Sequence, residues 1–287
     1  MSKESLRVGQ ISYSNCANVY HYVRKLCKRP GIHYLAGNPA VLNCLLRSGE
    51  IDLCLSSSIE FAYNAADYLV LPGYGLGSRG AMPSIRLFSR VPLERLDGAT
   101  VCLSAESATT AALCRVLLGN LLGQDNRYTV LAADLEDGLA QADGLVLIGD
   151  RALAANQRAL DFNLYSYDLS QIWQEHTGLP FVFALWIIRE DSALAAGELL
   201  VSFWQALVQA HRLIADPEDE LIRSVLATRK YFTRRSLLDF WDAIAYELTD
   251  SHLAGLNLFY RLCHESGILQ RPAELRVFDP EKNISAA

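Results

Sequence analysis

Residues 7–22, RVGQISYSNCANVYHY, join an apolar strand pattern, an uncharged polar tip and the start of a helix pattern. The same order recurs twice downstream. IHYLAG (32–37) precedes NPAVLNCLLRSG (38–49), and IDLCLSS (51–57) precedes SIEFAYNAAD (58–67). Short apolar runs that alternate with amphipathic segments predict strand–helix units and a largely parallel sheet. The opening stretch therefore indicates an α/β protein.

The strand–helix pattern restarts after SRVPLERLDGA (89–99), which predicts a second α/β unit. That unit includes the predicted strand TVCLSAES (100–107) and the predicted helix TTAALCRVLLGNLLG (109–123). From residue 191 onward the pattern is wholly helical and long enough to return to the first unit. We expect two lobes with a cleft between them, residues 1–89 plus 191–287 forming lobe 1 and residues 90–190 forming lobe 2.

Composition limits the classes of partner. The chain has 287 residues, a hydrophobic content of 51% and a net charge of −6, which is ordinary for a soluble globular protein. Neither nucleic acid nor an anionic membrane is an expected partner, because both need clustered Lys and Arg. The N-terminus lacks the order of a signal peptide, and the longest apolar run, LPFVFALWII (179–188), is too short to span a bilayer. We expect a cytoplasmic protein.

Cysteine and histidine spacing indicates no metal site. The seven cysteines include no CxxC pair, and no two of the six histidines share a helical turn. Cys16 has two interpretations, a nucleophilic thiolate or a buried packing residue, and the second is favoured because no motif supplies a base. His176 is interpreted as structural, and Glu60 as a residue that complements a helix dipole.

Uncharged polar residues gather where the predicted strands end. Ligands of open parallel sheets bind at these ends, where hydroxyls and the N–H groups of helix N-termini can hold an anion without lysine. Such residues are also ordinary helix caps, and Asp150 in particular is expected to be an N-cap. Because Ser56–Ser58 and Ser107–Thr110 are expected to face each other across the cleft, we predict two anion sites and a dianionic or dicarboxylate ligand. The candidate binding residues are Ser14, Ser56, Ser57, Ser107, Thr109, Thr110, Gly149 and Asp150, with Asn15 and Ser84 beside them.

Six stretches carry a resemblance to a known family. The chain resembles the chorismate dehydratases of menaquinone biosynthesis that act in the futalosine route, from about residue 7 to residue 190. The family commonly has Ser where this chain has Thr110, and either hydroxyl can donate. The stretches are SYSNC (12–16), GEIDLCLSSSIEFAY (49–63), GSRGAMPSIRLFSR (77–90), LSAESATTAALCRVLL (103–118), LIGDRAL (147–153) and YSYDLSQIWQEHTGLPFVFALWIIR (165–189).

The resemblance implies a fold and a reaction. The fold is that of the type II periplasmic binding proteins, with two α/β lobes around a cleft and C-terminal helices. The reaction removes water from chorismate to give 3-[(1-carboxyvinyl)oxy]benzoate, a carbon–oxygen lyase step without cofactor or metal. The expected partner is the small molecule chorismate, and a homodimer is a further expectation.

The chemistry of chorismate assigns roles within the uncharged cluster. No matched motif supplies a basic side chain, so the enolpyruvyl carboxylate of the substrate is one candidate for the base. Asn15 would hold that arm or the departing hydroxyl, since its side chain is a neutral donor and acceptor. We therefore predict Asn15 as the main catalytic residue and Ser84 as a second one that donates to the substrate.

Two other functions compete with this prediction. A sibling lyase of the same route, which forms 1,4-dihydroxy-6-naphthoate, resembles this chain but has a histidine at the position of Gly149. A solute-binding protein for a small dicarboxylate would have the same architecture without catalysis, and such proteins are exported. Gly149 favours the dehydratase over the first rival, and the N-terminal sequence favours it over the second.

Overall fold

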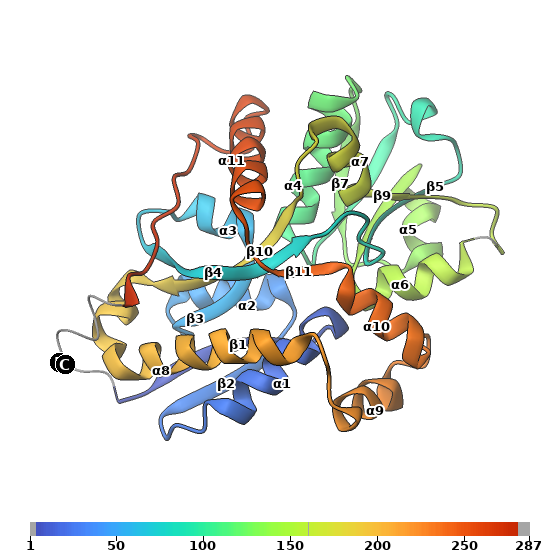
Figure 1. Cartoon of the computed structure of the whole chain (residues 1–287). Coiled ribbons are helices and arrows are strands. Elements are labelled where there is room, and N and C mark those ends of the chain that lie inside the picture. The colour runs from blue at the N-terminus through green and yellow to red at the C-terminus, as the bar shows by residue number, and fades with distance from the viewer. Residues whose placement is uncertain (1–3, 160, 281–287) are drawn as a thin grey trace.

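The computed structural model describes residues 4–159 and 161–280, and it contains two sheets, each covered by helices (Figure 1). The six-stranded sheet of the first lobe has the order β11-β4-β10-β3-β1-β2. Its strands are β1 (Leu6–Ile11), β2 (Ile32–Gly37), β3 (Leu53–Ser57), β4 (Tyr68–Ser78), β10 (Val182–Arg189) and β11 (Ile244–Glu247).

The sheet of the second lobe has five strands in the order β7-β6-β8-β5-β9. These strands are β5 (Ile85–Ser89), β6 (Thr100–Ser104), β7 (Arg127–Leu131), β8 (Gly144–Ile148) and β9 (Tyr165–Asp168). The chain crosses between the lobes twice, at residues 79–84 before β5 and at residues 178–181 before β10.

Helices follow most strands, as the alternating pattern predicts. The first lobe holds η1 (Ser14–Cys16), α1 (Ala17–Leu26), α2 (Pro39–Ser48), α3 (Ser58–Tyr63), α8 (Glu190–Ile214), α9 (Asp219–Thr228), α10 (Arg234–Asp242) and α11 (Asp250–Glu265). The second lobe holds η2 (Leu93–Arg95), α4 (Ala108–Val116), η3 (Leu117–Leu121), α5 (Leu135–Gln141), α6 (Gly149–Arg158) and α7 (Leu169–Thr177).

Local signals explain several of these boundaries. Asn38 caps α2 by accepting a hydrogen bond from the Val41 backbone nitrogen at 2.9 Å, and Pro39 occupies the first helical position. Gly49 ends the helix in the left-handed conformation, with φ of +77°. The limits of α2 are therefore set by the residues at its own two ends.

The arrangement of strands corrects three expectations. Both sheets are mixed, because β10 runs antiparallel to β3 and β4, and β5 runs antiparallel to β8 and β9. β5 belongs to the second sheet and β10 to the first, so both expected lobe boundaries, near residues 90 and 190, divide the chain one strand too late. The tail is not wholly helical, since β11 adds an edge strand to the first sheet. The reason is the same each time: the partner of a strand lies far away in sequence, beyond any local pattern.

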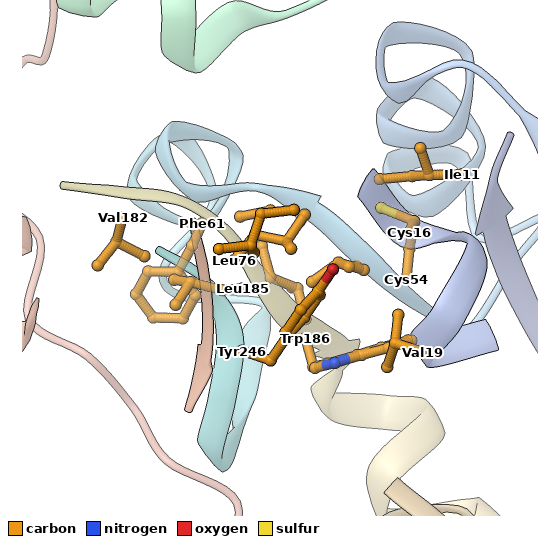
Figure 2. Packing of buried hydrophobic residues seen from close by; sticks show 14 of the residues in the cluster. Ile11, Cys16, Val19, Cys54, Phe61, Leu76, Val182, Leu185, Trp186 and Tyr246 are labelled. Carbon is orange, nitrogen blue, oxygen red and sulfur yellow. The ribbon is translucent and has the colours of Figure 1, made fainter. Parts of the chain in front are cut away.

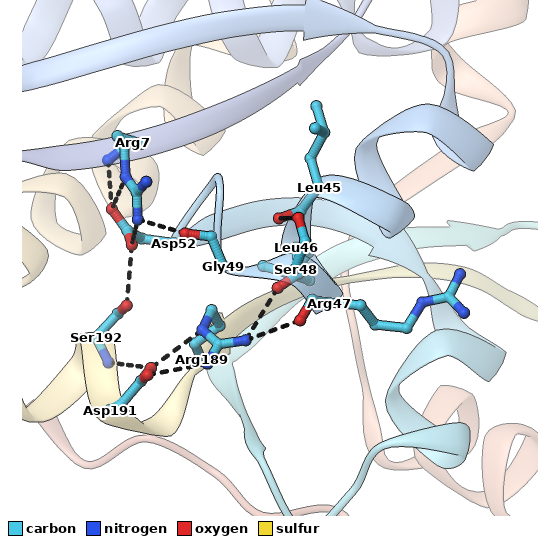
Figure 3. A network of polar contacts seen from close by, with 10 residues as sticks. All are labelled: Arg7, Leu45, Leu46, Arg47, Ser48, Gly49, Asp52, Arg189, Asp191 and Ser192. Carbon is cyan, nitrogen blue, oxygen red and sulfur yellow. Dashed lines mark hydrogen bonds and ion pairs between the residues drawn. The ribbon is translucent and has the colours of Figure 1, made fainter.

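A polar network fastens β10 and α8 to the first lobe (Figure 3). The fully buried carboxylate of Asp52 accepts hydrogen bonds from the Arg7 side chain and, at 2.9 Å, from the Ser192 hydroxyl. Arg189, at the end of β10, donates to the carbonyls of Leu46 and Arg47 in the last turn of α2. The end of β10 and the start of α8 are therefore fixed to the N-terminal strand–helix units of the first lobe.

Helix α8 has the length and apolar character of a membrane span, and it is the one such helix in the described ranges. In the structure it packs lengthwise on α1 in the first lobe (Figure 1). Its Phe203 ring meets Trp186 of β10 edge to face, with ring centroids 5.4 Å apart. Figure 2 shows Trp186 among the buried side chains of the sheet. The apolar stripe of α8 thus serves the core of the first lobe.

Candidate active site

A cavity of about 50 Å³ lies where the two lobes meet. None of the described residues that line it is a Lys, Arg, His, Asp or Glu. The lining residues are Ile11, Tyr13, Asn15, Pro39, Ser57, Leu76, Ser84, Ile85, Ser107, Thr110, Ile148, Gly149, Phe183 and Ala184.

The structure brings six of the ten predicted site residues to this cavity. Their roles toward a ligand stay predictions, but their common location is a result of the fold. These six residues are Asn15, Ser57, Ser84, Ser107, Thr110 and Gly149.

The cavity wall carries several polar groups. The side-chain oxygen of Asn15 is buried and accepts no hydrogen bond from any described residue. The hydroxyls of Ser57 and Ser84 also belong to wall residues, and Ser57 makes no side-chain cap bond to α3. Thr110 accepts a hydrogen bond from the Ser107 hydroxyl at 3.1 Å, which leaves its own O–H proton free to donate. Buried polar groups are normally paired, so these groups are suited to a polar ligand.

Helix N-termini add positive potential to the uncharged wall. Ser107 is the N-cap of α4, Gly149 is the first residue of α6, and Pro39 is the first residue of α2. All three residues line the cavity. The free N–H groups and dipoles of helix N-termini stabilise anions, which explains how this site could hold carboxylates without a basic side chain.

Ser56 and Thr109 do not line the cavity, contrary to the prediction. The Ser56 hydroxyl is fully buried and donates to Asn43 of α2. The Thr109 hydroxyl accepts from the Ile59 backbone nitrogen at 3.2 Å and lies 3.3 Å from the Ser58 hydroxyl. Thr109 thus joins α4 of the second lobe to α3 of the first, whereas Ser56 bonds within the first lobe, and the two do not face each other across an open cleft. A cap motif alone does not tell whether its hydroxyl already has a partner.

Ser14 and Asp150 also lie outside the cavity wall, and they contact each other. Asp150 accepts a hydrogen bond from the Ser14 backbone nitrogen at 3.1 Å. Its other oxygen accepts from Arg229 Nε at 2.6 Å. Asp150 therefore contacts the segment that carries Asn15 rather than capping α6, for which no side-chain cap bond is present.

The comparisons with known proteins agree with this geometry. The sequence profile of a family described as menaquinone biosynthesis matches residues 6–265. The chain belongs to the menaquinone biosynthesis family. The family relationship confirms the resemblance that the six sequence stretches indicated.

Two curated relatives of this chain are both named chorismate dehydratase. One is a chorismate dehydratase of Thermus thermophilus, 35% identical over 198 residues, which are 64% of this chain and 70% of the relative. The other is a chorismate dehydratase of Campylobacter jejuni, 30% identical over 190 residues, which are 65% of this chain and 69% of the relative.

Solved structures confirm the expected fold. A protein from Archaeoglobus fulgidus matches with a TM-score of 0.74 at 18% identity, over 94% of this chain and all of that one. The alkanesulfonate-binding protein of Xanthomonas axonopodis matches with a TM-score of 0.68 at 15% identity, over 95% of this chain and 96% of that one. At such low identity these matches support the fold alone, which is that of the periplasmic binding proteins with two α/β lobes.

Tyr13 is a wall residue that the sequence prediction left without a role. Its hydroxyl donates to Glu106 Oε2 at 2.8 Å, and this bond joins the first lobe to the second. Burial raises the pKa of Tyr13 above its ordinary value, and the bond to Glu106 adds to the effect. Tyr13 is therefore a neutral donor in this family member and not a base. The partner of its hydroxyl lies 93 residues away, so local sequence could not have indicated the contact.

Cys16 and His176 occupy the structural positions expected of them. Cys16 is fully buried near Cys54 among apolar side chains (Figure 2), and burial raises the pKa of its thiol well above the ordinary value. A buried neutral thiol is unreactive, so the packing interpretation is confirmed. His176 Nδ1 lies 2.9 Å from the Ile172 carbonyl within α7.

A larger hollow of about 460 Å³ lies within the first lobe, beside α8, α10 and β11. None of the ten predicted residues lines it, and its polar wall carries charges, including Arg79, Asp216 and Asp242. The smaller cavity between the lobes is therefore the better candidate for the site, because residues of both lobes supply hydroxyl groups there.

Glu60 is buried in α3, and its burial predicts a pH effect on stability. Burial raises its pKa from an ordinary value of 4.5 to about 7, although Arg47 Nε lies 3.0 Å from its carboxylate. Between these pH values the folded protein holds a proton that the unfolded chain releases. The stabilising contribution of the protonated group is therefore complete below about pH 4.5 and is lost as the pH rises through about 7.

We expect the free energy of unfolding to fall by about 3 kcal/mol through this group between pH 4.5 and pH 8, at about 1.4 kcal/mol per pKa unit. Urea unfolding at several pH values would measure the fall in the wild type and in Glu60→Gln, which cannot ionise at this position. The two stability curves should converge at low pH and separate at high pH. Parallel curves would contradict the assignment.

Proposed function

We propose that this chain is a chorismate dehydratase, which converts chorismate to 3-[(1-carboxyvinyl)oxy]benzoate and water in menaquinone biosynthesis. The observation that carries the proposal is the uncharged cavity, which is lined by hydroxyl groups from both lobes and by the unpartnered side-chain oxygen of Asn15. Chorismate has two carboxylates, and the groups that suit them are donors placed at opposite sides of one cavity. The names of the two curated relatives support the same substrate.

The reaction breaks two bonds and makes the ring aromatic. The ring carbon that carries the ether oxygen loses its proton, and the pair of electrons from that C–H bond completes the aromatic system. The C–O bond to the neighbouring hydroxyl breaks, and this hydroxyl leaves as water with the proton. Negative charge that develops toward the ring carboxylate would be stabilised by donors aimed at it, such as Ser57 or Thr110.

The base in this proposal is the substrate itself. The described residues of the cavity wall include no carboxylate, imidazole, amine or thiol, and Tyr13 is held neutral. The enolpyruvyl carboxylate of chorismate can fold over the ring, and its basicity rises where water is excluded. Asn15 would orient this arm or the departing hydroxyl, and Ser84 would donate to the substrate from the opposite lobe.

The environment of Gly149 disfavours the activity of the sibling lyase for this chain. Gly149 has a φ of +59°, and an added Cβ would lie 3.0 Å from the Tyr13 ring. A histidine at this position would need both a strained backbone and a displaced Tyr13. The wall is therefore built for a residue without a side chain.

Addition of chorismate to the purified protein tests the function directly. We expect an increase in the ultraviolet absorbance of an aromatic product, and mass spectrometry should find that product lighter than chorismate by one water. Binding without conversion would overturn the dehydratase and favour a solute-binding protein. Conversion of cyclic dehypoxanthine futalosine instead would favour the sibling lyase.

The proposal also covers the reaction class, the biosynthetic route, the cellular location and the oligomeric state. Elimination of water across a carbon–oxygen bond makes the enzyme a hydro-lyase, and we place it in the futalosine route. We further propose that it acts in the cytoplasm and forms a homodimer. Cell fractionation and light scattering of the purified protein would test these two points.

A further inference from the structure

We propose that Asp150 and Arg229 are positioning residues that couple closure of the lobes to the placement of Asn15. The proposal rests on the catalytic role proposed for Asn15. The side-chain hydrogen bonds of Asp150 and Arg229 go to Ser14, to Ser12 and to each other, and not to Asn15. It starts from the segment between β1 and α1, residues 12–15, which presents Asn15 to the cavity. The backbone of this segment forms hydrogen bonds with residues of both lobes.

The first lobe holds one side of the segment. Trp241 Nε1 donates to the Ser14 carbonyl at 2.8 Å, and the Tyr246 hydroxyl donates to the Asn15 carbonyl at 2.9 Å. Both donors are at least nine-tenths buried and belong to the same lobe as the segment. These two bonds do not depend on the position of the second lobe.

The second lobe supplies one contact to the segment backbone, through Asp150 in the first turn of α6. Its Oδ1 accepts from the Ser14 backbone nitrogen at 3.1 Å, and its Oδ2 accepts from Arg229 Nε at 2.6 Å. Arg229, at the end of α9 in the first lobe, also donates from Nη2 to the Ser12 carbonyl at 3.0 Å. The ion pair therefore encloses residues 12–14, and it is complete only when α6 lies against the first lobe.

The two sides of the contact between the lobes differ in chemistry. On the α4 side, α4 packs on α3 and α11, and apolar residues of both lobes form one continuous core. On the α6 side, hydrogen bonds and an ion pair join the lobes: Asp150 with Arg229, Tyr13 with Glu106, and Gln157 Nε2 with the Tyr231 carbonyl at 2.6 Å. Water can replace hydrogen bonds on opening, whereas exposure of apolar surface is costly. Opening should therefore occur on the α6 side and break the contact between Asp150 and Ser14.

The consequence is a link between closure and catalysis. When α6 moves away from the first lobe, Asp150 leaves with it. The Ser14 N–H group then loses its acceptor, and Arg229 loses its carboxylate partner. Closure over the substrate restores both and fixes the backbone on each side of Asn15. A misplacement of about 1 Å can lower the rate about 10²-fold, so this restraint acts on turnover more than on binding.

Steady-state kinetics of four single variants test the proposal. Asp150→Ala and Arg229→Met should lower kcat by about 10-fold or more, with KM changed less than about 3-fold, because the cavity wall remains intact. Asp150→Asn keeps an acceptor for Ser14 and should retain more activity than Asp150→Ala. Arg158→Met is the matched control. Arg158 lies on α6, like Asp150, but its ion pair is with Glu136 of α5 and not with residues 12–15. The double variant Asp150→Ala/Arg229→Met should be no worse than Asp150→Ala alone.

Small-angle X-ray scattering of the ligand-free proteins separates this inference from the proposed function. The wild type and Arg158→Met should have the same radius of gyration, and Asp150→Ala and Arg229→Met should have a larger one. Equal radii in all four proteins would overturn the proposed closure. A kcat of Asp150→Ala within 2-fold of Arg158→Met, or a rise of KM at unchanged kcat, would overturn the positioning role. A wild type that does not convert chorismate would overturn the proposed function, while scattering would still decide whether the pair holds the lobes together.

Discussion

Replacement of Asn15 by leucine is expected to lower the turnover of chorismate by about 10²–10³-fold, the usual cost of removing one well-placed donor from a catalytic site. Leucine has nearly the size of asparagine, so the shape of the cavity wall should change little. The buried oxygen of Asn15 has no partner among the described residues, and its loss therefore breaks no contact within the protein. The effect should fall on the reaction and not on the fold.

The measurement is kcat for Asn15→Leu beside its melting temperature. Asn156→Leu is a matched control, because Asn156 lies on α6, bonds to Ser166 and does not line the cavity. This control should keep nearly full turnover. If Asn15→Leu retained a rate within 3-fold of the wild type, Asn15 would have no catalytic role.

Replacement of Gly149 by histidine is the change with the second largest expected effect. A side chain at a φ of +59° costs about 1–3 kcal/mol of stability. The added Cβ would also lie 3.0 Å from the ring of Tyr13, which must then move. The ring must give by a few tenths of an ångström, and the histidine side chain would occupy part of the cavity. We expect turnover to fall by about 10²-fold, the cost of a misplaced site.

Two further variants separate the causes. Gly98→His places the same side chain at a φ of +71°, where an added Cβ has no neighbour within 4 Å, so it should lower stability without lowering turnover. Gly149→Ala adds only the Cβ and should lose less activity than Gly149→His. Unfolding in urea gives the stability of each variant, and the chorismate assay gives its rate. Full activity of Gly149→His would remove the argument against the sibling lyase.

Much of the candidate site was predictable because it is made of local features. Ser107 caps α4 through a bond to the Thr110 nitrogen at 3.2 Å, and both residues line the cavity. A strand followed by a polar tip and a helix predicts where that tip will lie, whatever the rest of the chain does. The absence of charge in that tip pointed to a site that binds anions through neutral donors.

The wrong predictions for Ser56, Thr109 and Asp150 have a common physical origin. Ser56 and Thr109 have the residue type and strand-end location of ligand groups, but their hydroxyls are used by Asn43 and Ile59. Asp150 looks like an N-cap and instead bonds to residues 136 and 79 positions away. Whether a polar side chain is free depends on its neighbours in space, and these come from other elements.

The amino-acid sequence by itself determined the strand–helix units, their caps, the uncharged polar tips and the family, because each is encoded within a few consecutive residues. Only the tertiary structure decided that β10 inserts antiparallel between β3 and β4, and that Arg229 and Tyr246 meet the segment around Asn15. These contacts join residues more than 100 positions apart. Their partners are selected by how whole elements pack, and no local dihedral preference or periodicity records that choice.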